Sequence, residues 1–360
     1  MNKIKFYALC TRNLDALKRH QKYIPKEDLC IIINTIDDTF ASDAKEYCVE
    51  QGIESYITFS DGTASTGKNS FFDTFLASDN DYAILIDGDD FITPHGVWTY
   101  KQLAESGNFP DAISLEYQYG IYPLDGYDHE IFGGGLNNFP LSMKLGSSNY
   151  SDPDQLHGMG KRIFLMPYNW WEAAKEGTLI PITEDDTGFQ QKWRDTHHEW
   201  ISRCYKYINK WETHCRLVGF SRKAAGMFRF DPEFVVGEDT IMWFDYKHQH
   251  YLGNLVLKSL FDVYPTYVYD IRLPGVVDEN RNKGGKDKGW CNWLVTLNAA
   301  YAERENEGKL HEFDLPKITV CEDSTAEGAD LDADIVWPEG YKPNVLGLVN
   351  YPVTKTIKYV

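Results

Sequence analysis

The chain has 360 residues, of which 42% are hydrophobic and 25% are charged, and both fractions are ordinary for a globular protein. Its length allows one large α/β domain with insertions, or two domains. The formal net charge of −18 argues against a protein that binds nucleic acid over its whole surface, but it is compatible with a local basic groove. The seven cysteines are odd in number and scattered, and we find no secretory signal and no run long enough to span a bilayer. We therefore expect a cytoplasmic protein with reduced thiols and no membrane partner.

Strands and helices alternate along the first part of the chain. Four short runs rich in apolar residues predict strands, at residues 3–9, 28–34, 54–59 and 82–86. Helices are expected between them, to about residue 22, across 40–51 and after the glycine-bearing stretch 60–70, and Gly52 is expected to end the second helix. Because the strands and helices alternate in this way, the sequence predicts an α/β fold with a doubly wound, mostly parallel sheet flanked by helices.

The alternation lapses after a further strand predicted at residues 111–116. Residues 117–160 are rich in Gly, Asn, Asp, Ser and Tyr and are too many for a structureless connection, so we expect a functional lid or an inserted subdomain. Further helices are predicted at 189–212, from residue 238 onwards and at 289–305, and residues 312–339 are rich in acids. These changes divide the chain into residues 1–116, 117–310 and 311–360.

Three carboxylates follow the buried strand at 82–86, namely Asp87, Asp89 and Asp90. Thr93 and Pro94 then supply an N-cap and a helix-compatible first residue. In open α/β sheets, ligands bind in the crevice beyond the carboxyl ends of the strands. Clustered carboxylates repel one another unless something neutralises them, and a divalent cation held by oxygens is the usual answer. A solvated acidic turn is the simpler alternative, although it explains three acids at a buried strand less well than one or two.

The stretch from Gly62 to Asn69 suggests a different kind of nucleotide site. It nearly matches the phosphate-binding loop Gly-x-x-x-x-Gly-Lys, with a strand before it and a helix after it. That pattern requires Ser or Thr directly after Lys68, because the hydroxyl coordinates magnesium, and Asn69 stands there instead. The loop also follows the third predicted strand, where the pattern normally follows the first. We keep an NTPase or kinase as the alternative from a different functional class.

A larger set of motifs points to a family. The stretch Thr66–Ser70, taken together with Asp81–Pro94, resembles the nucleotide-sugar domain of GT-A glycosyltransferases, and it is most similar to the large inverting family that carries Arg-Asn before the helix leading to Asp-x-Asp-Asp. The resemblance covers roughly residues 3–116, with a second matching patch at 226–250. It implies a GT-A (Rossmann-like) fold in which the first segment binds the nucleotide sugar, the second holds inserted acceptor-side elements and catalytic residues, and the third is an acidic extension.

The resemblance also implies ligands and the residues that hold them. The enzyme would be a hexosyl- or pentosyltransferase that uses Mn²⁺ or Mg²⁺ and a nucleotide-sugar donor, with a UDP-sugar as the first expectation. The family's donor-binding positions correspond here to Thr11, Arg12, Asp37, Asp38, Lys68, Asn69, Asp87, Gly88 and Arg272. The metal ligands would be Asp87 and Asp89, with His248 or His250 as the candidate for a third, although a histidine on a helix is more often a surface residue. Lys68 stands where the family more often has arginine, and either cation can meet a phosphate.

A second acidic pair matters for the chemistry. Inverting transfer needs a carboxylate that takes the proton from an acceptor hydroxyl as that hydroxyl attacks the anomeric carbon. In the family a Glu-Asp pair at a helix start fills this role, which here is Glu238 and Asp239. We predict Asp239 as the base and expect Glu238 to help place the acceptor. The alternative is that the two acids merely complement the dipole of their helix.

A basic segment rich in aromatic residues suggests what kind of acceptor the protein binds. Residues 190–226 hold eight Lys or Arg against three acids, and Arg281–Lys288 is a second basic run. Such a surface suits a phosphate backbone, with aromatic rings stacking on an exposed base. The predicted acceptor-binding residues are Trp193, Arg194, Lys206 and Trp211. An amphipathic helix with a solvated basic face explains the same pattern.

The composition is rich in Tyr, Asn and Asp, which resembles phage proteins. Large phages use glycosyltransferases to decorate hydroxylated pyrimidines, so our hypothesis is a phage enzyme in the host cytoplasm whose partner is double-stranded DNA with modified cytosine. The alternatives are a transferase for surface glycans, lipid carriers or proteins, and a carbohydrate-binding module without catalysis.

Overall fold

The computed structural model describes residues 2–88, 90–115, 119–123, 163–167, 216–232, 234, 238–262, 266–270, 299–313, 315–321 and 356–359. The first half follows the predicted alternation, with β1 Ile4–Cys10, α1 Leu14–Tyr23, β2 Leu29–Asn34, α2 Asp38–Gln51, β3 Glu54–Thr58, α3 Ala64–Ala77 and β4 Tyr82–Asp87. It continues with β5 Phe91–Ile92, α4 Pro94–Glu105, β6 Ala112–Leu115, β7 Tyr119–Pro123 and β8 Ile163–Pro167.

The second half adds β9 Arg216–Ser221, α8 Arg222–Met227, α9 Glu238–Tyr251, β10 Leu257–Asp262, β11 Tyr267–Asp270, β12 Lys317–Cys321 and β13 Thr356–Tyr359. The described part of the helix predicted at 289–305 is helical over residues 299–306. No helix in the described ranges combines the length and the apolar character needed to cross a membrane.

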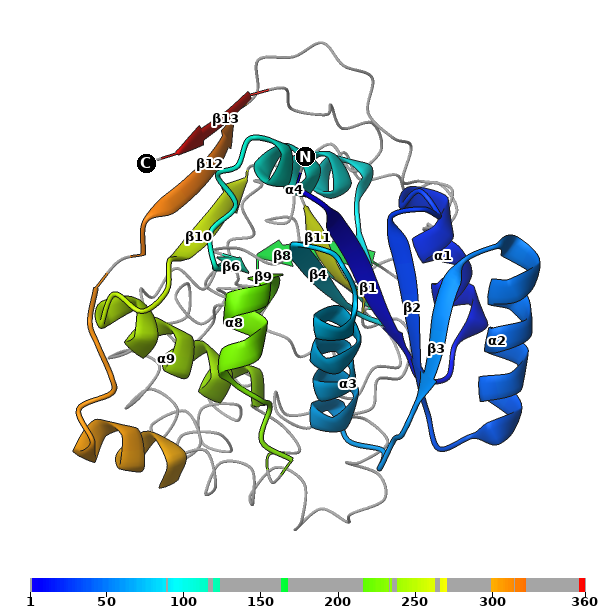
Figure 1. Cartoon of the computed structure of the whole chain (residues 1–360), viewed down its shortest axis with the longest axis horizontal. Helices are drawn as coiled ribbons and strands as arrows, with labels where there is room; N and C mark the ends of the chain where they lie inside the picture. Colours follow the sequence, from blue (N-terminus) through cyan, green and yellow to red (C-terminus); the bar gives the residue numbers. More distant parts are fainter. Residues whose placement is uncertain are drawn as a thin grey trace, which may run out of the picture.

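Nine strands form one sheet in the order β13-β12-β10-β6-β9-β4-β1-β2-β3 (Figure 1). The pairs among β1 to β4 are parallel, as are those of β10 with β6 and β12, which confirms the predicted α/β fold with a mostly parallel sheet. This sheet takes strands from all three segments into which the composition divides the chain.

Strand β9 departs from the predicted pattern. It was not predicted as a strand, and it pairs antiparallel with both β4 and β6 in the middle of the sheet. Because β9 runs against its neighbours, its first residue, Arg216, lies at the edge where the parallel strands end; its ladder partner there is Leu115, the last residue of β6. This direction brings a cation to the carboxyl edge of the sheet.

A second sheet, in the order β5-β11-β7-β8, starts directly after the acidic turn that ends β4. Within it, β11 runs antiparallel to β5 and parallel to β7. The pairing sets Tyr267 opposite Ile92, five residues beyond Asp87 in the sequence. The second sheet therefore delivers an aromatic hydroxyl to the same edge as β9.

Apolar side chains fill both faces of the large sheet, because neighbouring residues of a strand point to opposite sides. In β1, Tyr7 and Leu9 pack with the helices α3, α8 and α9, whereas Phe6 and Ala8 pack with α1, α2 and α4. Strands β1, β2, β4 and β6 are therefore largely buried on both sides, which explains their continuous apolar runs. Strand β3, at the edge of the sheet, is mostly exposed. The helices form an outer layer on each face (Figure 1).

Local sequence signals explain where the helices begin and end. Asp37 and Thr93 cap α2 and α4 with their side chains, and Pro94 occupies the first turn of α4 as predicted. Gly52 ends α2 in the left-handed conformation, with a φ of 68°, which glycine adopts without strain.

Candidate functional site

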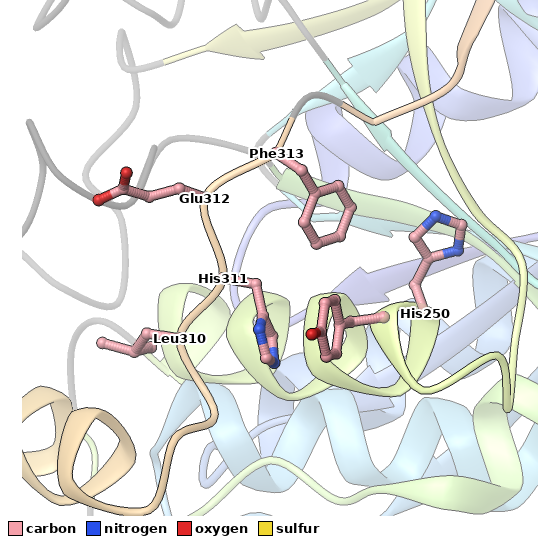
Figure 2. Close-up of a pocket in the computed structure, with 6 residues that line it drawn as sticks. His250, Leu310, His311, Glu312 and Phe313 are labelled. Carbon is pink, nitrogen blue, oxygen red and sulfur yellow. The ribbon is translucent and has the colours of Figure 1, made fainter.

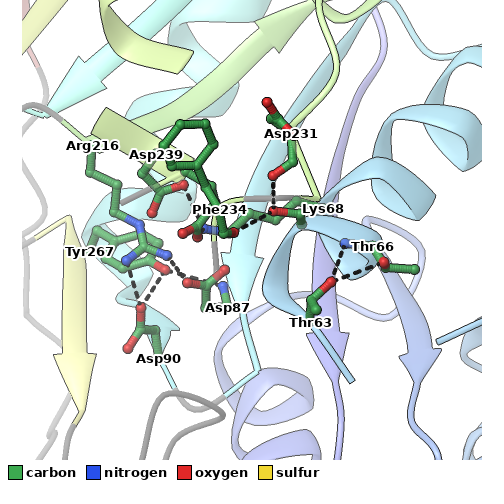
Figure 3. Close-up of polar contacts among 12 residues, drawn as sticks. Thr63, Thr66, Lys68, Asp87, Asp90, Arg216, Asp231, Phe234, Asp239 and Tyr267 are labelled. Carbon is green, nitrogen blue, oxygen red and sulfur yellow. Dashed lines mark hydrogen bonds and ion pairs between the residues drawn. The ribbon is translucent and has the colours of Figure 1, made fainter. Parts of the chain in front are cut away.

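Seven charged or hydroxyl-bearing side chains meet at the carboxyl edge of the sheet, beside the end of β4. They come from α3, the end of β4 and the turn after it, the start of β9, the start of α9 and the start of β11. They are Lys68, Asp87, Asp90, Arg216, Glu238, Asp239 and Tyr267, most of which Figure 3 shows. Four carboxylates here face two cations.

Lys68 lies between the two predicted catalytic acids. Its Nζ is 2.7 Å from Oε1 of Glu238 and 2.5 Å from Oδ1 of Asp239. The Lys68 side chain is only 3% exposed and that of Glu238 8%, whereas that of Asp239 is 33% exposed. Of the two acids, Asp239 is thus the one that a ligand from solvent can reach.

Arg216 holds the acids at the end of β4. Its guanidinium forms an ion pair with Oδ2 of Asp87, and its Nη1 lies 3.3 Å from Oδ2 of Asp90. The hydroxyl of Tyr267 donates to Oδ2 of Asp90 at 2.6 Å and accepts from the backbone N–H of Asp87 at 3.2 Å. The Arg216 guanidinium also lies 4.7 Å from the centre of the Tyr267 ring.

The charges of this cluster depend on one another. Burial by itself would lower the pKa of Lys68, but Asp239, Asp87 and Glu238 together raise that pKa above its ordinary value. Burial raises the pKa of Glu238, although Lys68 opposes the effect. For Asp87 burial acts in the same direction, but Arg216 and Lys68 outweigh it and hold the pKa of Asp87 below its ordinary value. Lys68 therefore interacts electrostatically with both the Asp87 side and the Asp239 side of the site.

Gly88 fixes the turn after β4 through close packing. A Cβ added at Gly88 would lie 1.7 Å from the backbone oxygen of Leu9 in β1, so no other residue fits without moving a strand. The Gly88 carbonyl oxygen lies 3.3 Å from Nε2 of the buried His20. This predicted donor-binding residue thus sets how closely the acidic turn approaches β1.

Other predicted donor-binding residues have structural partners. Asp37 accepts hydrogen bonds from the backbone N–H groups of Thr39 and Phe40, and Asp38 lies exposed in the first turn of α2. Both polar atoms of the Asn69 amide bond the backbone of Phe230, at 2.8 Å each, and so tie α3 to the segment before α9. Thr11 and Arg12, in the loop after β1, are half-buried.

The structure does not bring His248 to this cluster. His248 lies ten residues beyond Glu238 on α9, which is about 15 Å along a helix axis. Its Nδ1 lies 2.7 Å from Nε2 of His311, and the two rings are parallel. Near this end of α9 is an open cavity of about 610 Å³, shown in Figure 2, whose lining includes His250, His311 and Phe313.

Some predicted positions fall outside the described residues. These are Asp89, Arg272, Trp193, Arg194, Lys206 and Trp211. Their assignments stay predictions.

Three residues that complete the cluster, Arg216, Tyr267 and Asp90, are not identified as functional from the sequence. The sequence patterns indicate no function for Arg216 and Tyr267, and they single out Asp90 only as one of three clustered acids. Arg216 does carry a sequence signal, because it is a charged residue at the head of the apolar run Leu217–Phe220. Reading it would have required the direction of β9, which is a tertiary property.

The glycine-bearing stretch before α3 is not an extended phosphate-binding loop. Thr63 caps α3, and the helix begins at Ala64, so that Gly67 and Lys68 lie inside the helix. A phosphate-binding loop presents consecutive backbone N–H groups to a phosphate, and residues within a helix use theirs in the helix itself. Lys68 is moreover held by Glu238 and Asp239. This geometry disfavours the NTPase alternative.

Asp87 has the chemistry that a divalent cation requires. Its Oδ1 is buried and has no hydrogen-bond partner within the described part of the chain, while its Oδ2 binds Arg216. Carboxylate oxygens suit Mg²⁺ and Mn²⁺. Among the described residues, no three His, Cys, Asp or Glu side chains form a complete metal site.

Comparison with known proteins finds solved structures that resemble the chain at low sequence identity. No protein-family model and no curated protein sequence matches the chain. Among solved structures, S. aureus TarS overlaps 75% of this chain and 37% of its own length, with 9% identity and a TM-score of 0.37. TarS 1–349 in complex with UDP overlaps 85% of this chain and 68% of its own, with 11% identity and a TM-score of 0.38.

HddC from Yersinia pseudotuberculosis overlaps 36% of this chain and 66% of its own, with 16% identity and a TM-score of 0.24. This chain thus spans less than half the length of the first TarS structure. Similarities this low carry no argument about activity. The fold therefore rests on the observed strand order, and any function rests on the site itself.

Proposed function

We propose that this chain is a glycosyltransferase that binds a nucleotide-sugar donor at the carboxyl edge of the sheet and activates an acceptor hydroxyl with Asp239. The observation that carries the proposal is the contact of Lys68 with Glu238 and Asp239, which are 170 and 171 residues away in the sequence. Through this contact the acids predicted for proton transfer lie at the same edge as Asp87, predicted for donor binding. Two motifs with complementary roles in one reaction thus converge.

The exposure of the two acids supports their different roles. Asp239, the more exposed acid, takes the proton of the acceptor hydroxyl as its oxygen bonds to the anomeric carbon. The bond from that carbon to the nucleoside diphosphate breaks on the opposite side, so the configuration inverts. The sequence predicts that Glu238 helps to place the acceptor, but Glu238 is buried and bound to Lys68, so any effect on the acceptor passes through Lys68 and Asp239.

A divalent cation fits the donor side of this site. Asp87 would hold it through Oδ1, together with Asp89 from the same acidic turn. When bound, Mn²⁺ or Mg²⁺ offsets the negative charge of the departing nucleoside diphosphate.

Ligand-dependent thermal stability tests the donor site. UDP, UDP-GlcNAc and ATP are each added with and without Mn²⁺ or Mg²⁺, because a ligand that binds only the folded state raises its melting temperature. We expect a Mn²⁺-dependent increase with UDP or another nucleoside diphosphate and its sugar, and we expect Asp87→Asn to abolish it. An increase confined to ATP with Mg²⁺ would instead favour the NTPase.

Asp239→Asn tests the proton-transfer role separately. The variant should keep the donor-induced increase in melting temperature but lose about 10²- to 10⁴-fold in turnover, measured as release of nucleoside diphosphate from the donor. Asp245→Asn on the same helix is the matched control. If Asp239→Asn turned over the donor like the wild type, Asp239 would not be the base.

The acceptor part of the proposal, a hydroxylated pyrimidine in phage DNA, rests on the sequence alone. The four predicted contact residues, Trp193, Arg194, Lys206 and Trp211, lie outside the described ranges. Of the same basic segment, Arg216 is buried against Asp87 and Asp90 and is therefore not part of an exposed basic surface. A surface glycan or a protein is the alternative acceptor.

A further inference from the structure

Arg216 and Tyr267 hold the same two carboxylates, although they come from different sheets. Arg216 starts β9 of the large sheet, and Tyr267 starts β11 of the small one. Both contact Asp87 and Asp90, as Figure 3 shows for Arg216. We call these four residues the Asp87 clamp.

The clamp fixes Asp87 at two points. Arg216 binds Oδ2 of its side chain, and the Tyr267 hydroxyl accepts a hydrogen bond from its backbone N–H at 3.2 Å. Arg216 and Tyr267 are themselves immobilised, because Asp90 binds both and their side chains lie against each other. Asp90 is fully buried, so the clamp is anchored in the interior.

The clamp leaves one oxygen of Asp87 unused within the described chain. With Oδ2 held by Arg216, the buried Oδ1 keeps no hydrogen-bond partner there. A buried polar atom without a hydrogen-bond partner is costly unless a ligand supplies one. Asp87 thus has a fixed orientation and one oxygen, Oδ1, that can bind a cation.

We propose that Arg216 and Tyr267 are positioning residues that hold Asp87 with Oδ1 turned toward the divalent cation of the donor site. This inference rests on the proposed function. Groups that hydrogen-bond a metal-binding carboxylate from behind typically change metal affinity by about 10- to 100-fold when they are removed.

Arg216 can influence Asp87 as a nearby charge or as a group that fixes its orientation, and the two roles predict opposite changes in Mn²⁺ affinity when Arg216 is replaced. This makes the inference testable. Removing a positive charge beside Asp87 would by itself strengthen cation binding, because like charges repel. Losing the fixed orientation weakens it. Tyr267→Phe separates the effects further, because the pKa of Tyr267 is raised well above its ordinary value by burial, so the phenol is neutral and its loss changes no charge.

The experiment measures Mn²⁺ binding to the full chain by electron paramagnetic resonance, with and without UDP. The variants are Arg216→Met, Arg216→Lys and Tyr267→Phe. We expect each to weaken Mn²⁺ binding by about 10-fold or more. Arg216→Lys should lose affinity despite its charge, because an ammonium on a shorter, flexible side chain lacks the rigid planar fork with which the guanidinium holds Asp87 and Asp90 in a fixed orientation.

Arg222→Met is the matched control. Arg222 follows the other end of β9 and donates to the backbone oxygens of Leu76 and Ser78, at 2.6 and 2.8 Å. It should lower the melting temperature without changing Mn²⁺ affinity. Circular dichroism establishes that each variant is folded, and Tyr267→Phe, which leaves the ion pairs intact, carries the test if Arg216→Met is unfolded.

The outcomes separate this inference from the function on which it rests. If the wild type binds Mn²⁺ and UDP together while Tyr267→Phe and Arg216→Lys bind them equally well, the clamp has no positioning role. Tighter Mn²⁺ binding by Arg216→Met would likewise overturn it. If the wild type binds no Mn²⁺ even with UDP and UDP-GlcNAc, the metal-dependent donor site is wrong, and the clamp's role falls with it.

Discussion

At the scale of single residues, the site is built around two buried cations, Lys68 and Arg216. Each is bound by two carboxylates of elements that are distant in the sequence. Buried ion pairs contribute little net stability compared with apolar packing, but removing one partner leaves an uncompensated charge in the interior. Such an ion pair therefore adds little to the net stability of the fold, although removal of the cation alone destabilises the fold strongly.

Lys68→Met should therefore destabilise the protein strongly. It leaves Glu238, 8% exposed, and Asp239 without their cation, and we expect a loss of about 3–5 kcal/mol in the free energy of unfolding. Urea denaturation measures it. Lys3→Met breaks an exposed ion pair with Asp79 and should leave the midpoint unchanged. Equal midpoints for all three proteins would show that Lys68 is not needed as a counter-charge.

His20 makes stability depend on pH. Burial, with the charge of Arg19, lowers the pKa of His20 from 6.5 to about 3. Below pH 6.5 His20 is protonated in the unfolded chain, whereas in the folded chain it stays neutral down to about pH 3. The free energy of unfolding therefore falls as the pH falls through this window. Between pH 7 and pH 5 the loss is about 2 kcal/mol. His20→Gln should flatten this slope in urea titrations, and an unchanged slope would contradict the assignment.

At the scale of elements, the close approach of the acidic turn to β1 positions the end of β4. Gly88 leaves no room for a side chain beside Leu9, and this contact sets where Asp87 ends its strand. The register of β1 against β4 pairs Leu9 with Asp87 itself. The turn is therefore held by backbone packing as well as by the Asp87 clamp.

Gly88→Ala should displace this turn. A methyl group 1.7 Å from a backbone oxygen cannot be relieved by a side-chain rotation, so we expect a loss of about 3 kcal/mol or more. Gly226→Ala is the control, because its added Cβ meets nothing within 4 Å and alanine favours the helix α8. Thermal denaturation compares them. Similar melting temperatures for the two variants would mean that the turn yields easily.

At the scale of the whole molecule, charge constrains the acceptor. With a net charge of −18, any grip on DNA must come from a local basic surface, such as that predicted within residues 190–226. Binding through phosphate contacts weakens steeply with salt. We expect duplex DNA binding, measured by fluorescence anisotropy, that falls between 50 and about 200 mM salt. Absence of salt-sensitive binding would remove DNA as the acceptor and leave the transferase.

The sequence by itself determined the strands and helices of the first half and the acidic end of β4. The apolar runs of β1 to β4, the caps Asp37 and Thr93 and the terminating Gly52 act within a few residues, so periodicity and cap chemistry reveal them. The same holds for an acid that directly follows a buried strand, as Asp87 does.

Only the tertiary structure decided which charges meet there. Arg216 reaches Asp87 because β9 enters the sheet antiparallel, and Lys68 reaches Glu238 across 170 residues. Strand order and direction arise from the packing of distant segments, which local patterns do not encode. The cations that neutralise the predicted acids could therefore be found only in the folded chain.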